Sequence, residues 1–435
     1  MNKKMLAGCL FGASLAVRSL AADAGFMLRD GGRVVFLGDS ITEQKLFTTY
    51  IEAYAVTRFP QQQFHFWNSG WGGDTAWLRM RSHCDEKALF AAQGETQQKL
   101  VEKAVDGCLT RDVLFYKPTV VLVDFGMNDH NYEPFREDIF RAYVRSQAEI
   151  VNMLAKGGAR VVLLTPQPIE ERRADPDQDP RNQSLCKFGA GLKEVAARQN
   201  AMFIDQFEPY MGIMLREHAG KTNACIGGGD AIHPGPIGHT LMAAIILKGL
   251  GAPALVSSAA LDVTALPGNQ GIQAARCTIT NAKFDNDVLS FDRADECLPM
   301  PIDARALDAL KLAPVLNDLS RYELKVTGLT AGKYDVTMDG EPAATVSKEE
   351  LARGWNLTAV PGPITKQTQE LLALLFKKGE VGGRLWSVLI RPKRAAQRPG
   401  LEAEIADLEA RIAAACQPKP HHFELKPSSG APKGN

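Results

Sequence analysis

The sequence predicts an α/β fold: a doubly wound (flavodoxin-like) parallel sheet of five strands flanked by helices, with a smaller β-rich module and C-terminal helices. Three observations predict the main sheet. Short apolar runs alternate with longer helical stretches between about residues 32 and 250. The runs are rich in β-branched and aromatic residues, as in strands buried on both faces. Polar motifs follow several of these runs, at the sheet edge where ligands bind in such folds.

Each expected strand is three to six residues long. The five runs cover residues 34–37, 64–67, 120–125, 161–164 and 202–204. The clearest helix between them spans residues 135–156 and is followed by Gly157 and Gly158, which favour a helix C-terminus. We assign residues 30–252 to this first domain.

The chain changes character after Pro253. Strand-like runs separated by turn residues, such as Asp339-Gly340, predict a β-rich module over residues 275–360. Residues 361–417 are predicted to be helical and to pack back on the core. Residues 418–435 are rich in Pro, Lys, Gly and Ser, a composition typical of a disordered tail.

One apolar stripe marks the last predicted helix. Its members follow a four-three-four spacing: Leu401, Ile405, Leu408 and Ile412. Two heptads are too short for a stable coiled coil, so docking against the chain's own core is favoured over oligomerisation. The oligomeric state stays open.

Residues 1–21 have the pattern of a cleaved signal peptide. Lys3 and Lys4 precede a short apolar stretch, and small residues follow at the expected cleavage site. The stretch is too short to span a bilayer, and no later segment has a transmembrane pattern. We expect a secreted or periplasmic protein; a lipoprotein anchored through Cys9 is the less favoured alternative.

Composition excludes some partners. The formal net charge is 0, which argues against a nucleic-acid partner. No Cys-x-x-Cys pair indicates a zinc site, and we expect no metal and no cofactor.

Seven cysteines remain after cleavage at residue 21. Pairing of sequence neighbours would join Cys84 to Cys108, Cys186 to Cys225 and Cys277 to Cys297, with Cys416 left over. Buried free thiols are an equal alternative for each pair.

The first polar motif is Gly38-Asp39-Ser40, directly after the first predicted strand. A serine on this turn would lie at the carboxyl edge of the sheet, beside the free N–H groups of a helix N-terminus. Ser40 is therefore a candidate nucleophile. The alternative is a purely structural helix cap.

Two further motifs offer hydrogen-bond donors. Gly73, before Asp74 and Thr75, can bring its backbone N–H close to a substrate, although an ordinary glycine loop is the alternative. Asn128, in Gly-Met-Asn-Asp, has two side-chain N–H donors that can complete an oxyanion hole, although Asn-Asp is also common in turns.

The fourth motif pairs Asp230 with His233 in Asp-Ala-Ile-His. Histidine is the usual general base for a serine, and a carboxylate can orient its ring. A capping aspartate and a loop histidine are the alternative. His239 lies six residues on, but no third ligand supports a metal site.

In this order the four motifs resemble those of the SGNH (GDSL-type) hydrolases over about residues 30–250. The resemblance implies a serine esterase in which Ser40, Asp230 and His233 are catalytic. It also implies an oxyanion hole formed by Ser40, Gly73 and Asn128. The rest of the chain resembles, more weakly, the C-terminal extension of some large secreted bacterial members.

The resemblance implies hydrolysis of short-chain acyl esters, and we favour O-acetyl groups on a carbohydrate or another small-molecule substrate. Trp71 and Trp77 could stack on a sugar ring or simply pack in the protein. A lipid-directed esterase or lysophospholipase, a glycan-binding protein without turnover, and an assembly role for the C-terminal half remain alternatives.

Overall fold

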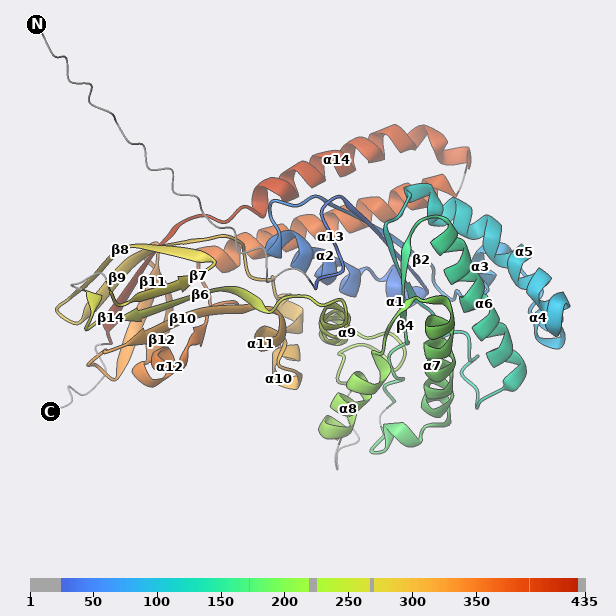
Figure 1. Cartoon of the computed structure of the whole chain (residues 1–435), viewed down its shortest axis with the longest axis horizontal. Helices are drawn as coiled ribbons and strands as arrows, with labels where there is room; N and C mark the ends of the chain where they lie inside the picture. The colour runs from blue at the N-terminus through green and yellow to red at the C-terminus, as the bar shows by residue number, and fades with distance from the viewer. Residues whose placement is uncertain (1–24, 172, 219–224, 267–269, 391, 429–435) are drawn as a thin grey trace, which may run out of the picture.

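The computed structural model describes residues 25–428 except 172, 219–224, 267–269 and 391. The predicted signal peptide lies outside the described residues. The molecule is elongated, with an α/β part at one end and a β-rich part at the other (Figure 1). Two long helices, α13 (Pro363–Leu389) and α14 (Arg398–Ala415), run alongside both parts.

The α/β part contains the predicted parallel sheet of five strands, in the order β2-β1-β3-β4-β5. The strands are β1 (Gly32–Gly38), β2 (Phe64–Gly70), β3 (Val120–Asp124), β4 (Arg160–Leu164) and β5 (Met202–Ile204). The order reverses direction at β1, which lies between β2 and β3. Loops that leave the carboxyl ends of these three strands therefore meet at one edge. The predicted fold class is confirmed.

Side chains of β1 alternate between two cores, as a strand covered on both faces requires. Val34 and Phe36 join the core on one face, whereas Val35 and Leu37 join the core on the other. The first core is covered by α2 (Leu46–Arg58), α8 (Phe207–His218), α9 (Pro236–Gly249) and part of α13. The second is covered by α5 (Gly94–Asp112), α6 (Glu137–Lys156) and α7 (Pro180–Gln199).

The β-rich part is larger than predicted. It begins with β6 (Leu255–Asp262), earlier than residue 275, and has two sheets, ordered β13-β10-β6-β7 and β12-β11-β14-β9-β8. The remaining strands are β7 (Ile272–Ala275), β8 (Cys277–Asp285), β9 (Val288–Asp295), β10 (Arg321–Thr327), β11 (Lys333–Met338), β12 (Glu341–Ser347), β13 (Trp355–Asn356) and β14 (His421–Pro427).

The prediction of a disordered tail from residue 418 was wrong for its first half. β14 lies in the middle of its sheet, between β11 and β9. Phe423 and Leu425 are fully buried, and Phe423 stacks on Phe291 with ring centroids 5.2 Å apart. Alternating buried side chains define this strand, and the Pro- and Lys-rich composition of the whole segment hides that alternation.

The helices α13 and α14 form an antiparallel hairpin that packs on the α/β part (Figure 1). Leu401, Leu408 and Ile412 are buried, so most of the apolar stripe faces inside the chain. Lys378 of α13 lies 2.7 Å from Glu52 of α2 and 3.2 Å from Glu409 of α14. The largely buried pair with Glu52 ties α13 to the first domain, and the pair with Glu409 ties α13 to α14.

The predicted cysteine pairs are not formed. The thiols of Cys277 and Cys297 are free and donate to two separate backbone carbonyls of β6, those of Ser258 and Val256. Cys84, Cys108 and Cys186 are likewise free. Closeness in the sequence does not predict disulfide pairing here, because the fold directs these thiols toward other partners.

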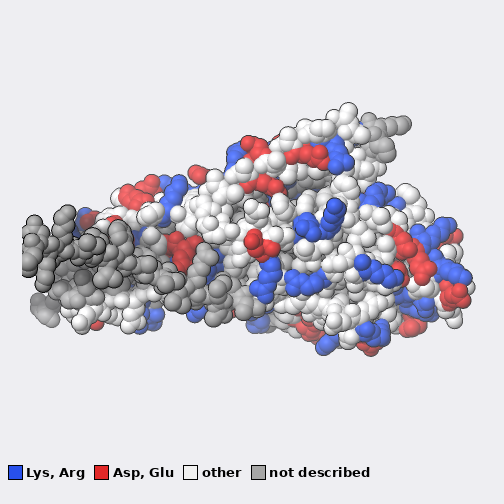
Figure 2. Space-filling view, turned by 45° about the horizontal axis from the view of Figure 1, so that its top comes forward, with Lys and Arg blue, Asp and Glu red and all other residues white. Residues whose placement is uncertain are grey.

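Both signs of charge are interspersed over the face of the molecule drawn in Figure 2. Across residues 25–428, as far as they are described, no helix combines the length and the apolarity needed to cross a bilayer.

Candidate active site

Ser40 is the first residue of α1 (Ser40–Glu43), directly after β1. Asp39, and not Ser40, caps this helix: its carboxylate accepts a hydrogen bond of 2.9 Å from the Ile41 N–H. A Cβ on Gly38 would lie 2.6 Å from the Asp124 carbonyl oxygen, so only glycine fits this close approach to β3. Because Asp39 caps the helix, the Ser40 hydroxyl has no capping role.

The structure brings Ser40 together with both residues of the fourth motif. Ser40 Oγ lies 2.9 Å from His233 Nε2, and His233 Nδ1 lies 3.2 Å from Asp230 Oδ2. The other carboxylate oxygen of Asp230 accepts from the backbone N–H of His233 at 2.7 Å and of Ile232 at 2.8 Å. Three side chains from the two ends of the domain thus form one continuous hydrogen-bonded line.

Asp230 is held in its charged form. Burial raises its pKa, but the two backbone N–H donors and the His233 ring outweigh this effect and leave the pKa below its usual value. The side chain of Asp230 is 67% exposed and that of His233 is 37% exposed. The pair therefore lies at an open surface that a substrate can reach.

The loop after β2 packs against the start of α1. The N–H of Gly72 donates to Glu43 Oε2 at 2.8 Å, and a Cβ on Gly72 would lie 3.9 Å from Ser40 Cβ. Gly73 has a φ of 75°, a conformation that favours glycine. Its carbonyl oxygen accepts from Arg79 Nε at 2.7 Å, which fixes the peptide plane.

Asn128, buried to 6% exposure, lies against the same loop. Its Nδ2 donates to the Asp74 carbonyl oxygen at 3.0 Å, and the hydroxyl of Tyr132 donates to its Oδ1 at 2.9 Å. These bonds fix the amide orientation and use one of its two N–H groups. Sequence reasoning missed Tyr132, because its contact with Asn128 arises from a turn with a φ of 57°.

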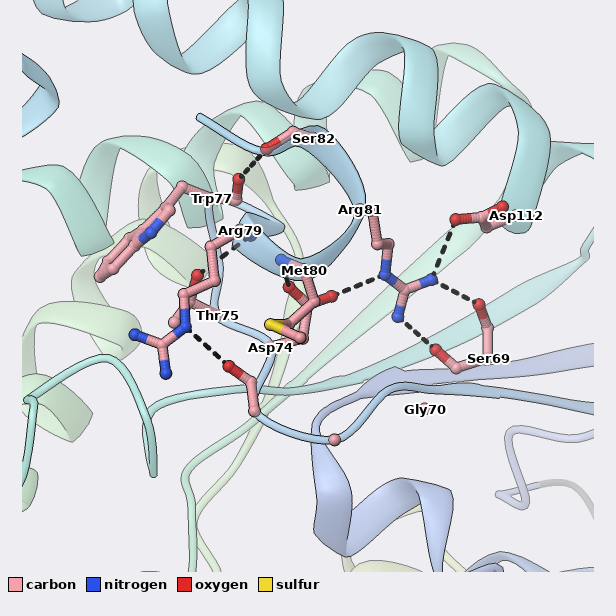
Figure 3. Close-up of polar contacts among 12 residues, drawn as sticks. Ser69, Gly70, Asp74, Thr75, Trp77, Arg79, Met80, Arg81, Ser82 and Asp112 are labelled. Atoms are coloured by element: carbon pink, nitrogen blue, oxygen red, sulfur yellow. Dashed lines mark hydrogen bonds and ion pairs between the residues drawn. The ribbon is translucent and has the colours of Figure 1, made fainter. Parts of the chain in front are cut away.

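A buried arginine, Arg81, anchors this loop through Asp74 and Ser69 (Figure 3). Arg81 Nε lies 2.6 Å from Asp74 Oδ2, and Arg81 Nη1 lies 3.2 Å from Asp112 Oδ2. Its Nη2 donates to the Ser69 carbonyl oxygen at 2.6 Å. Burial raises the pKa of Asp74 and Arg81 partly offsets this rise. Sequence reasoning missed Arg81 because no local motif marks it.

Three more carboxyl groups are buried near Ser40. Burial raises the pKa of Asp124 to about 7 and that of Asp129 to about 8. Burial, together with repulsion from Asp124, holds the pKa of Asp39 well above its usual value. Buried in this way, these groups carry less than a full negative charge near neutral pH.

Two candidates from the sequence have structural roles. His239 is buried between Gln44 and the Phe47 N–H, and burial lowers its pKa to about 3. Trp77 is fully buried and donates to Glu86, so it cannot stack on a sugar. Trp71, in contrast, is half-buried. Within the described ranges, no three His, Cys, Asp or Glu side chains gather as metal ligands.

Residues 36–241 match the family model of the GDSL-like lipase/acylhydrolases. This range of the chain is a GDSL-like lipase/acylhydrolase domain. It is a carboxylic ester hydrolase. The matched range contains all five residues that the sequence motifs singled out.

One relative is the acetylxylan esterase of Geobacillus stearothermophilus, 26% identical over 180 residues, which span 38% of this GDSL-like chain and 77% of the relative. A solved structure of an acetylxylan esterase from that organism is 20% identical, with a TM-score of 0.40 over 52% of this chain and 96% of its own.

A gut microbial diltiazem-metabolizing enzyme shares the whole architecture. It is 24% identical, with a TM-score of 0.76, and the match covers 92% of this chain and 98% of that one. The GDSL-like domain, the β-rich part and the helical hairpin therefore form a fold that a second protein also adopts.

Proposed function

We propose that this GDSL-like hydrolase is a serine esterase that removes short acyl groups, chiefly O-acetyl, from carbohydrates. The observation that carries the proposal is the line from Ser40 through His233 to Asp230 at the carboxyl edge of the sheet. Nucleophile, base and orienting carboxylate have these distances and this order in serine hydrolases.

In the first step, Ser40 Oγ attacks the ester carbonyl carbon while His233 Nε2 takes the hydroxyl proton. The Ser40–His233 separation of 2.9 Å is suitable for this transfer. Asp230 accepts the Nδ1–H of the ring, which fixes the tautomer with a free Nε2 and stabilises the imidazolium.

The tetrahedral oxyanion would be held by the backbone N–H groups of Ser40 and Gly73 and by Asn128 Nδ2. The first lies at the N-terminus of α1, where the helix dipole favours negative charge. The Asn128 amide is already oriented by Asp74 and Tyr132, so little reorganisation is needed. Loss of one such donor typically raises the barrier by about 3–4 kcal/mol.

The tetrahedral intermediate then breaks down, and water completes the reaction. His233 gives its proton to the leaving alcohol, and the acyl group stays on Ser40 Oγ. Water then attacks the acyl carbon as His233 takes its proton. His233 returns this proton to Ser40 Oγ as the bond between Oγ and the acyl carbon breaks, which releases the acid and restores the Ser40 hydroxyl. These steps use only the side chains named here.

The acetyl and carbohydrate assignments are supported by the acetylxylan esterase relative. The half-buried Trp71, beside Gly72, offers an aromatic surface near Ser40. We also propose that residues 1–21 direct export and are removed, which N-terminal sequencing of the mature protein tests.

Hydrolysis of 4-nitrophenyl esters from acetyl to dodecanoyl tests the reaction. The protein without its first 21 residues is compared with Ser40→Ala and with a control, Ser290→Ala, in the β-rich part. We expect fastest release of acetyl, loss of activity in Ser40→Ala and full activity in the control. Peak activity on long chains would indicate a lipid substrate. Equal activity in Ser40→Ala would refute the proposed nucleophile, and no activity on any ester would leave a glycan-binding role.

A further inference from the structure

A groove of about 750 Å³ lies between the loop after β2 and the hairpin of α13 and α14. Its volume is within the range of about 300–1,000 Å³ that small-molecule sites have. The GDSL-like domain contributes Glu43 and Trp71 to its lining, and the hairpin contributes Trp386, Arg394 and Gln397. The groove is thus shared between the catalytic domain and the C-terminal extension.

Ser40 does not itself line this groove, but residues next to it do. Glu43, in its lining, lies three residues after Ser40 on the same short helix and accepts from the Gly72 N–H. Gly72 itself packs toward Ser40 Cβ. The Trp71 N–H donates to the Gly38 carbonyl oxygen at 3.0 Å, which ties this side of the groove to the end of β1. A molecule that occupies the groove can therefore extend to the proposed nucleophile.

Two tryptophans, one from each part of the chain, meet in the groove. The rings of Trp71 and Trp386 are perpendicular, with centroids 5.0 Å apart. The guanidinium of Arg81 lies 5.6 Å from the Trp71 ring and 5.7 Å from the Trp386 ring. Because Arg81 is itself held by buried carboxylates, the aromatic pair has a rigid support. Both rings are half-buried and line the groove.

The rest of the lining contains positively charged, negatively charged and amide side chains, together with aliphatic ones. Lys45, Glu380, Arg384 and Gln397 offer donors and acceptors. Arg384 is paired with Glu404 at 2.8 Å at the exposed rim of the groove. Flat aromatic surface beside charged and amide groups suits a polyhydroxylated ring, which presents C–H faces and hydroxyl edges. A long acyl chain would instead need a continuous apolar lining.

We propose that this groove binds the sugar rings that flank the acylated residue, so that the C-terminal hairpin sets the preference for oligosaccharides over small esters. The proposal rests on the proposed esterase function and deepens it. Trp386 would be a specificity-determining residue that makes no contact with the reacting atoms.

The test compares kcat/KM for fully acetylated trisaccharides and monosaccharides, of xylose and of glucose, in the full chain. We expect the native protein to prefer the trisaccharide of at least one sugar. In Trp386→Ala this ratio should fall about three- to tenfold, the size expected for loss of one aromatic contact, while kcat/KM for 4-nitrophenyl acetate stays unchanged. Trp386→Phe should keep most of the preference.

A second groove variant is needed in case Trp386→Ala does not fold. Arg394→Ala changes an exposed residue of the groove and should also lower the ratio. Arg411→Ala, on α14 but outside the groove lining, should leave it unchanged. A native ratio near one for both sugars, or a ratio that neither groove variant lowers, would overturn the proposal.

Failure of the esterase reaction itself would be recognised separately. If the native protein hydrolyses no ester, calorimetric titration with the unacetylated trisaccharides still tests the groove. Binding that weakens in Trp386→Ala but not in Arg411→Ala supports the groove as a saccharide site. Absence of binding to both sugars overturns it.

Discussion

The Tyr132 hydroxyl donates a hydrogen bond of 2.9 Å to Asn128 Oδ1. With the bond from Asn128 Nδ2 to the Asp74 carbonyl oxygen, it fixes which way the amide faces. Asn128 would otherwise be free to rotate and present its oxygen, an acceptor, to the substrate oxyanion. The pair therefore links a residue that no motif marks to the proposed oxyanion hole.

Tyr132→Phe should lower kcat about two- to tenfold with little change in KM, since a hydrogen bond of this kind contributes about 0.5–1.5 kcal/mol. Steady-state kinetics with 4-nitrophenyl acetate measure both constants. Tyr334→Phe removes a hydroxyl bonded to Asp287 in the β-rich part and serves as the control. An unchanged kcat in Tyr132→Phe would show that the amide is oriented without this bond.

Asp230→Asn should reduce kcat more than it reduces substrate affinity. An asparagine can no longer stabilise the imidazolium of His233, and its amide can favour the wrong ring tautomer. Because Asp230 is 67% exposed, we expect a loss of about ten- to a hundredfold rather than the larger loss seen for buried triads. Asp335→Asn, at a half-buried position in the β-rich part, is the control. Wild-type kcat in Asp230→Asn would exclude the orienting role.

Arg81→Met should destabilise the fold by about 3–5 kcal/mol, because it leaves Asp74 buried without its cation. Asp112 keeps Arg111 as a partner. Chemical denaturation measures the loss in the free energy of unfolding. Arg136→Met, which breaks an exposed pair with Asp138, should cost less than about 1 kcal/mol. Similar losses in the two variants would contradict the anchoring role of Arg81.

The stability of the protein should depend on the ionisation of Asp124. Burial raises its pKa to about 7, whereas an unfolded aspartate ionises near about 3.9. The folded chain thus keeps a proton that the unfolded chain releases, so the contribution of this group to stability falls as pH rises from about 4 to 7. Above that range its contribution no longer changes.

Asp124→Asn removes this pH dependence. The difference between the Tm of this variant and that of the native protein should increase as the pH is raised from about 5 to 8. The Tm of Asp407→Asn, a change at an exposed position on α14, should change with pH in the same way as that of the native protein. A difference between Asp124→Asn and the native protein that is constant across this pH range would show that Asp124 is ionised throughout.

The parts of the fold that depend on local pattern could be predicted from the sequence. Apolar runs such as the one that ends at Leu37 specify buried strands, and the polar residues after them lie together because parallel strands end at one edge. Ser40 lies at this edge, and His233 and Asp230, in the loop before α9, lie beside it.

The missed features depend on contacts between distant segments. Arg81 and Tyr132 acquire their partners only when loops fold against each other. β14 follows a helix of 18 residues and joins strands more than 80 residues earlier in the chain, so composition alone could not place it. The supporting residues of the site were for this reason less predictable than its reacting groups.

Covalent labelling tests the central claim most directly. The protein is treated with a fluorophosphonate, digested and analysed by mass spectrometry, with His233→Ala treated in parallel. We predict one phosphonylated site, at Ser40, with loss of hydrolysis in proportion to labelling and little labelling in His233→Ala. Full labelling at another residue, or retained hydrolysis after Ser40 is modified, would contradict the account.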